Sequence, residues 1–197
     1  MSALRLLALA LALVSSAACA TPGRVKTDIW HSLTPEQQKE AAVLERAMIR
    51  LCEYAWTQGS LSCYLPRVVI VGDGITPHYN PGSNTIYMPR RALSTGGRYA
   101  AAHELGHWYL GHNAQRCGDP AACEMEANWA GFQILREGYG YDGDTAWRIM
   151  HQYLQRLVES KRKPSKGHPP ACVELNDYLR RSEMPPHQCE EPVGVVR

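Results

Sequence analysis

The sequence lacks the features that mark several large classes of protein. It has no basic stripe interleaved with aromatic residues, so we expect no nucleic-acid partner; the formal net charge of +2 argues neither for nor against one. It has no internal repeat. It also has no C-x-x-C pair, and this absence argues against a zinc ion held by cysteines. The 197 residues, 45% hydrophobic and 20% charged, are instead typical of one soluble globular domain.

The N-terminus predicts export. Arg5 precedes an apolar run from Leu6 to Val14, which is too short to span a bilayer, and small residues follow, so residues 1–18 are expected to be a signal peptide. The run Ser16-Ala17-Ala18-Cys19 resembles a bacterial lipobox, which predicts cleavage before Cys19 and lipid on its thiol. The triplet Ala18-Cys19-Ala20 also fits the A-x-A site of ordinary secretion, so both outcomes stay open.

The expected location is the bacterial periplasm. No Asp follows Cys19, which by resemblance to bacterial lipoproteins favours anchoring at the outer membrane. Residues 19–31 then form a tether, and residues 32–197 form a single domain. Membrane attachment through the lipidated N-terminus is therefore predicted.

Cysteine parity agrees with export. Of seven cysteines, six remain when Cys19 is set aside, and six can all pair in an oxidising compartment. The short spacings suggest the pairs Cys52–Cys63, Cys117–Cys123 and Cys172–Cys189, the last of which would staple the C-terminal segment. Other pairings stay open, because spacing alone does not fix connectivity.

Periodicity and turn residues predict an α+β domain with a small sheet and several helices. The segment 73–83 is rich in Gly and Pro and is expected to be a loop, and 161–166 a linker. The expected strands are 67–71 and 84–88, and the expected helices are 34–57, 94–110, 124–136, 142–160 and 173–181.

The helix expected at 94–110 contains the pattern H-E-x-x-H. His103 and His107 project from one helix face, one turn apart, and two neutral imidazoles so placed can hold one zinc ion. Glu104 would face the open coordination position and take a proton from water there. A surface helix with two histidines and one acid is the plainer alternative, because so short a pattern also occurs by chance.

A catalytic zinc usually needs a third protein ligand. The metzincin pattern H-E-x-x-H-x-x-G-x-x-H is missed by one residue at both Gly111 and His112, so we do not assign His112 as that ligand. A glutamate from the following helix is the alternative, and the run Glu124-Met125-Glu126-Ala127-Asn128 offers two. Glu124 and Glu126 lie about 200° apart around a helix, so both cannot easily bind one ion.

The combination A-H-E-L-G-H followed by E-x-E-A-N-x-x-A resembles the gluzincin zinc metallopeptidases. It is closest to the ImmA/IrrE-type group and is similar to the HtpX-like and CaaX-protease group, over roughly residues 84–136. The resemblance implies that Glu124 is the third ligand and that Asn128, one turn later, supports a histidine ligand through its free ring nitrogen. It also implies a zincin-like fold in which the strand 84–88 is an edge strand that binds the substrate backbone by strand addition.

The expected function is therefore hydrolysis of a protein or peptide substrate with one Zn²⁺ and Glu104 as general base. His151 and Tyr141 are candidates for contact with the oxyanion or substrate, although each also fits plain packing. The export signals and cysteines depart from the ImmA/IrrE-type pattern, so substrate knowledge does not carry over. A catalytically weak, metal-stabilised binding or assembly lipoprotein of the envelope is the alternative, and an interaction lipoprotein without metal is a third reading.

Lipidation of Cys19 can be tested by metabolic labelling with a fatty acid. Wild type should be labelled and remain with the membrane, whereas Cys19→Ser should be unlabelled and soluble, because the thiol is the only predicted attachment point. Equal labelling of both forms would exclude lipid on Cys19.

Overall fold

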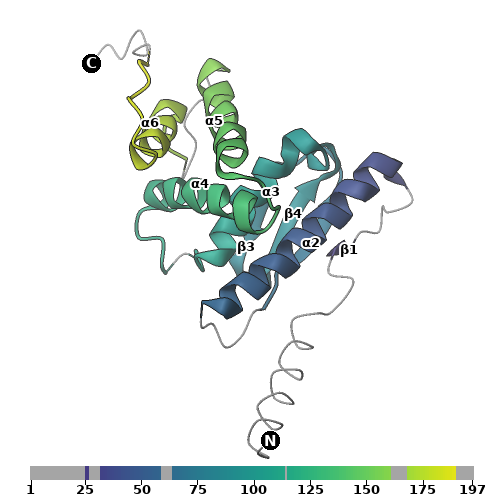
Figure 1. The fold of residues 1–197 in the computed structure, drawn as a ribbon. Helices are drawn as coiled ribbons and strands as arrows, with labels where there is room; N and C mark the ends of the chain where they lie inside the picture. The colour runs from purple at the N-terminus through teal and green to yellow at the C-terminus, as the bar shows by residue number, and fades with distance from the viewer. Residues whose placement is uncertain (1–24, 27–31, 59–63, 114, 161–167, 190–197) are drawn as a thin grey trace, which may run out of the picture.

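The computed structural model describes residues 25–26, 32–58, 64–113, 115–160 and 168–189 (Figure 1). Within these residues the chain forms five α-helices and one small mixed sheet, which confirms the expected α+β class. The signal peptide, Cys19, most of the tether and the linker lie outside the described residues. No helix in the described part of the chain is long and apolar enough to cross a membrane.

The elements agree with most of the expected ranges. The helices are α2 (Pro35–Thr57), α3 (Arg98–Tyr109), α4 (Pro120–Glu137), α5 (Gly143–Glu159) and α6 (Ala171–Arg181). The strands are β1 (Val25–Lys26), β2 (Arg67–Val71), β3 (His78–Asn80) and β4 (Thr85–Pro89). Three short 3-10 turns follow β3 and β4: η2 (Pro81–Ser83), η3 (Arg90–Ala92) and η4 (Thr95–Gly97).

The sheet has the order β1-β2-β4-β3. β2 and β4 are parallel, with Val68 opposite Ile86, and their buried side chains form one wall of the core. β3 pairs antiparallel with β4, with Tyr79 opposite Ile86. β1, which falls within the predicted tether, pairs with β2, so these two residues belong to the sheet.

The edge of the sheet differs from the sequence expectation. The predicted edge strand, 84–88, corresponds to β4, which lies inside the sheet between β2 and β3. The edge strand next to β4 is β3, and it lies in the segment that was expected to be a loop. Because β3 is short, flanked by Pro77 and Pro81, and only Tyr79 is apolar, its strand conformation comes from pairing with β4 rather than from local preference.

Helix α4 begins earlier than expected. Asp119 Oδ1 accepts a hydrogen bond from the Ala121 amide at 3.0 Å, and Pro120 occupies the first turn, so the helix starts before Glu124. Glu124 therefore lies inside the helix, where its direction is fixed. Helix α4 packs on α3, and α5 and α6 pack on α4 and on each other, as Figure 1 shows.

An ion pair ties the start of α3 to α2. Arg98 donates to Glu40 through Nε at 2.8 Å and through Nη2 at 2.7 Å, and both side chains are largely buried. The Arg98 guanidinium also donates to the Tyr141 hydroxyl. The hydrogen bonds from Arg98 lower the pKa of Glu40 below its ordinary 4.5, so the carboxylate is ionised in the folded state.

Replacement of Glu40 by Gln should destabilise the domain by about 1–3 kcal/mol at pH 7, because it removes charge-assisted hydrogen bonds. Since the folded pKa lies below the unfolded value, the stabilisation is complete above pH 4.5 and is lost as the pH falls through the folded pKa. Urea unfolding at pH 7 and near pH 3 measures both effects.

The matched control is Glu53→Gln, which changes an exposed residue of the same helix. It should leave the free energy of unfolding almost unchanged. Equal destabilisation of the two variants, or a Glu40→Gln effect that does not shrink in acid, would contradict the role given to the ion pair.

Candidate metal centre

Three predicted ligands meet in the structure. His103 and His107 point from α3 toward each other, with their Nε2 atoms 3.1 Å apart. Glu124 of α4 faces both: Oε2 lies 3.1 Å from His103 Nε2, and Oε1 lies 3.5 Å from His107 Nε2. One ligand atom from each residue lies within 4.8 Å of the others, as one bound ion requires.

The close approach of α3 and α4 produces this convergence. A Cβ atom on Gly106 would lie 2.7 Å from the carbonyl oxygen of Ala127, so only glycine allows the two backbones to come this close. Gly131 lies against the same stretch of α3, near the His103 amide. The Gly in H-E-L-G-H is therefore a packing residue that brings Glu124 within reach of the histidines.

The donor set fits a divalent cation. Two ring nitrogens at 3.1 Å with a carboxylate beside them need a proton or a metal ion between them. Burial opposes ionisation of Glu124, but hydrogen bonds from His103, His107 and His168 outweigh it and hold the pKa of Glu124 far below its ordinary value. Two imidazoles and one carboxylate suit zinc and other divalent transition metals.

Asn128 and Glu126 have different places. Asn128 Oδ1 lies 2.9 Å from His103 Nδ1, so of the two histidines that the resemblance left open it is His103 that Asn128 contacts. Its Nδ2 is buried and has no hydrogen-bond partner among the described residues. Glu126 turns away from the ligands and lies 3.2 Å from His112 Nε2, so Glu124 is the glutamate that joins the group.

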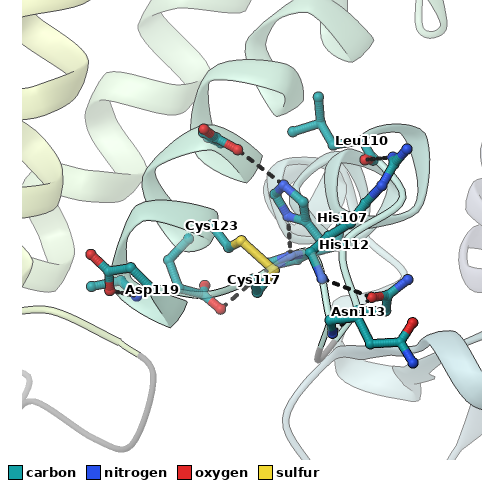
Figure 2. Close-up of a disulfide and its surroundings, with 12 residues drawn as sticks. His107, Leu110, His112, Asn113, Cys117, Asp119 and Cys123 are labelled. Atoms are coloured by element: carbon teal, nitrogen blue, oxygen red, sulfur yellow. Dashed lines mark hydrogen bonds and ion pairs between the residues drawn. A yellow bond between two sulfur atoms is a disulfide. The ribbon is translucent and has the colours of Figure 1, made fainter.

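A second group of donor atoms comprises His112, Cys117 and Cys123. The two sulfur atoms form a disulfide, with Cα atoms 5.9 Å apart, and Figure 2 shows it beside His112. Cys172 and Cys189 are also paired, with Cα atoms 6.2 Å apart, so two expected bridges are present. Cys63 lies outside the described residues, so the pairing with Cys52 stays a prediction.

His168 is a site residue that the sequence did not reveal. It precedes α6, and its Nδ1 lies 3.1 Å from Glu124 Oε2 and 3.9 Å from Glu174 Oε1. The sequence offered one signal: a histidine followed by Pro169 and Pro170, just ahead of the helix stapled by Cys172. The two prolines indicate that the backbone after His168 is rigid, but they do not show which residues the His168 side chain contacts.

Two cavities border the centre. The larger, about 1020 Å³, has walls that include His103, Glu104, His78 and His168, and it also contacts Glu174. The smaller, about 290 Å³, has Glu104, His103, His78 and His168 in its walls together with His107 and Glu124. Glu104 is buried, with 7% of its surface exposed, and it contributes to the walls of both cavities.

The two candidates for oxyanion contact lie elsewhere. Tyr141 accepts a hydrogen bond from Arg98, and the His151 ring stacks on Trp147 with centroids 4.6 Å apart. Neither residue is part of the described walls of the two cavities. Their placement gives no support to the oxyanion role.

Metal analysis of the purified domain tests the ligand set. Wild type at saturating zinc should bind about one ion per chain, as expected for a His-His-Glu site. His103→Ala, His107→Ala and Glu124→Ala should each lose most of it, because two protein ligands hold zinc poorly. At saturating zinc Glu126→Ala should still hold the ion, because Glu126 is not in the ligand group, and Glu137→Gln on the same helix is the matched control. Loss of zinc from Glu126→Ala but not from Glu124→Ala would overturn the assignment.

Comparisons with known proteins add no relative. No family model matches the sequence, and no curated protein or solved structure does either. What can be said of function therefore rests on the convergence of His103, His107 and Glu124 and on the cavities beside them.

Proposed function

We propose that this protein is an exported zinc metallopeptidase with a zincin-like domain. One observation carries the proposal: Glu104 faces the two cavities that border the three convergent ligand side chains. A purely structural zinc site needs no such carboxylate, because all its positions are filled by ligands. The disulfides are compatible with export.

The mechanism assigns each step to a residue of the chain. His103, His107 and Glu124 would hold the ion, and a zinc ion in such a site supplies Lewis acidity that activates water and polarises a carbonyl group. Glu104 takes the proton from the attacking water and passes it to the leaving amine. Burial of Glu104 keeps bulk water from competing for that proton.

His168 is our candidate for stabilising the oxyanion, in place of Tyr141 and His151. Its ring borders both cavities together with Glu104, and its Nδ1 is held by Glu124 at 3.1 Å. A ring held through Nδ1–H is preorganised to donate from Nε2 toward a carbonyl oxygen held near the ligands, and this role needs the imidazolium form, in which both ring nitrogens carry a proton.

Substrate backbone would bind along β3. This strand is at the edge of the sheet, packs against α3, and contributes His78 to the walls of both cavities. An extended peptide can add to such an edge through main-chain hydrogen bonds, which places its scissile bond beside Glu104. This mode of binding recognises the main chain of the substrate more than its side chains. We therefore expect peptides and unstructured protein segments as the substrate class.

Glu104→Gln separates an enzyme from a binding protein. The variant should keep zinc and its unfolding midpoint, because Glu104 is not in the ligand group. It should lose peptide hydrolysis by about two to four orders of magnitude, the usual contribution of a positioned acid–base group. Mass spectrometry of peptides released from an unfolded protein mixture measures the loss.

Glu137→Gln is the control, because Glu137 lies at the end of α4, away from both cavities. It should cleave at the wild-type rate. If wild type and Glu104→Gln release the same peptides at the same rate, the peptidase proposal fails. The metal-stabilised envelope binding or assembly protein would then be the better account.

A further inference from the structure

The turn that ends α3 places His112 directly on a metal ligand. Gly111 has φ +65°, a conformation that favours glycine, and a Cβ atom there would also lie 2.8 Å from Arg116 Nη1. The Gly111 amide donates to Trp108 O at 3.0 Å, and the His112 amide donates to His107 O at 2.9 Å. This is a Schellman motif, in which the residue after the glycine folds back onto the last turn of the helix.

The side chains of His107 and His112 are in contact, as their backbones are. His107 Nδ1 and His112 Nδ1 lie 3.0 Å apart, and His112 Nε2 lies 3.2 Å from Glu126 Oε2 (Figure 2). His112 is buried, whereas the Glu126 side chain is half exposed. The chain of contacts therefore runs from the metal-facing histidine to a carboxylate at the surface.

The donors and acceptors along this chain follow from metal binding. His107 must present an unprotonated Nε2 to the ion, so its proton sits on Nδ1. Nδ1–H of His107 then donates to Nδ1 of His112, which leaves the His112 proton on Nε2, where Glu126 accepts it. Each polar atom has one partner of the right kind.

We propose that His112 is a positioning residue for the metal centre: it holds His107 in the tautomer and orientation that present Nε2 to the ion, and Glu126 holds His112 in turn. His112 thus acts behind the ligand rather than as a third ligand. The inference rests on the proposed metal centre, but it does not depend on peptide hydrolysis.

The surroundings of His112 keep it in this place. The Cys117–Cys123 disulfide ties the loop after α3 to the first turn of α4, next to His112. Arg116 Nη1 donates to Leu110 O at 3.1 Å, which fixes the same loop to the end of α3. A loop closed at both ends limits the rotation of His112 and favours the single arrangement that the relay needs.

Zinc affinity, measured by competition with a chromophoric chelator, tests the role of His112. His112→Leu keeps similar bulk but removes both ring nitrogens, and it should weaken zinc affinity about 10–100-fold, the usual effect of losing an outer partner of a ligand. His112→Asn places its amide oxygen close to where Nδ1 was, so it should stay within about threefold of wild type. Nitrogen NMR of the zinc-loaded protein should show His107 protonated on Nδ1 in wild type and Asn, with that proton exchanging faster in Leu.

Glu126→Leu tests the same relay from the surface, where folding is not at risk. It should weaken zinc affinity by about threefold to tenfold, less than His112→Leu, because water can partly replace an exposed carboxylate. The matched control is Glu137→Gln on the same helix, which should match wild type.

The outcomes are distinct. If wild type binds no zinc, both the proposed centre and the role of His112 are overturned. If wild type binds zinc and His112→Leu binds it equally well, the positioning role of His112 is wrong, but the proposed metal centre still holds. Equal weakening by Leu and Asn would mean that His112 acts through packing and not through its hydrogen bond, which also overturns the proposal.

Discussion

The candidate metal centre depends on the distance between α3 and α4. Small residues line that contact, and Gly106 is the critical one because its missing Cβ would meet the Ala127 carbonyl oxygen. At this separation Glu124 lies 3.1 Å from His103 Nε2. A side chain at position 106 would push the helices apart and leave the carboxylate and the two imidazoles buried without one another, which is costly for groups that can carry charge.

The ligands are supported by contacts from several directions. Asn128 Oδ1 accepts from His103, the Nδ1 atoms of His107 and His112 lie 3.0 Å apart, and His168 Nδ1 lies 3.1 Å from Glu124. These partners come from α4, from the turn after α3 and from the segment before α6. Contacts of this kind fix the orientation of side chains that must bind an ion at defined angles, and they satisfy polar atoms that burial removes from water.

The outer parts of the fold serve the same centre. The Arg98–Glu40 ion pair anchors the start of α3 on α2, and the Schellman turn at Gly111 fixes its end, so the ligand helix is held at both termini. The Cys172–Cys189 bridge staples α6, whose preceding segment carries His168. The edge strand β3 completes the wall of both cavities opposite the helices. Side chains from distant parts of the chain thus face one space.

The features that the sequence alone determined are those that depend on the spacing of residues within one helix or turn. A helix carries residues i and i+4 on one face, so the pairing of His103 with His107 follows from the sequence alone, and turn residues located most helix ends. The expectation that Asn128 supports a histidine ligand came from the resemblance, and its position one turn after Glu124 is consistent with that role. The choice of Glu124 over Glu126 came from a resemblance, and in the structure the rotation of α4 against α3 places Glu124 with the two histidines.

Tertiary contacts decided the rest. β3 is a strand because β4 pairs with it, His168 reaches the centre because α6 packs on α4, and Tyr141 turns to Arg98. His112 lies one residue away from the position of the third metzincin ligand. In the structure the turn at the end of α3 folds it back, so that its ring contacts Nδ1 of His107. Most of these contacts join residues that are distant along the chain, and the contact of His112 depends on the geometry of one turn. Hydrophobic periodicity carries no information about either kind of contact.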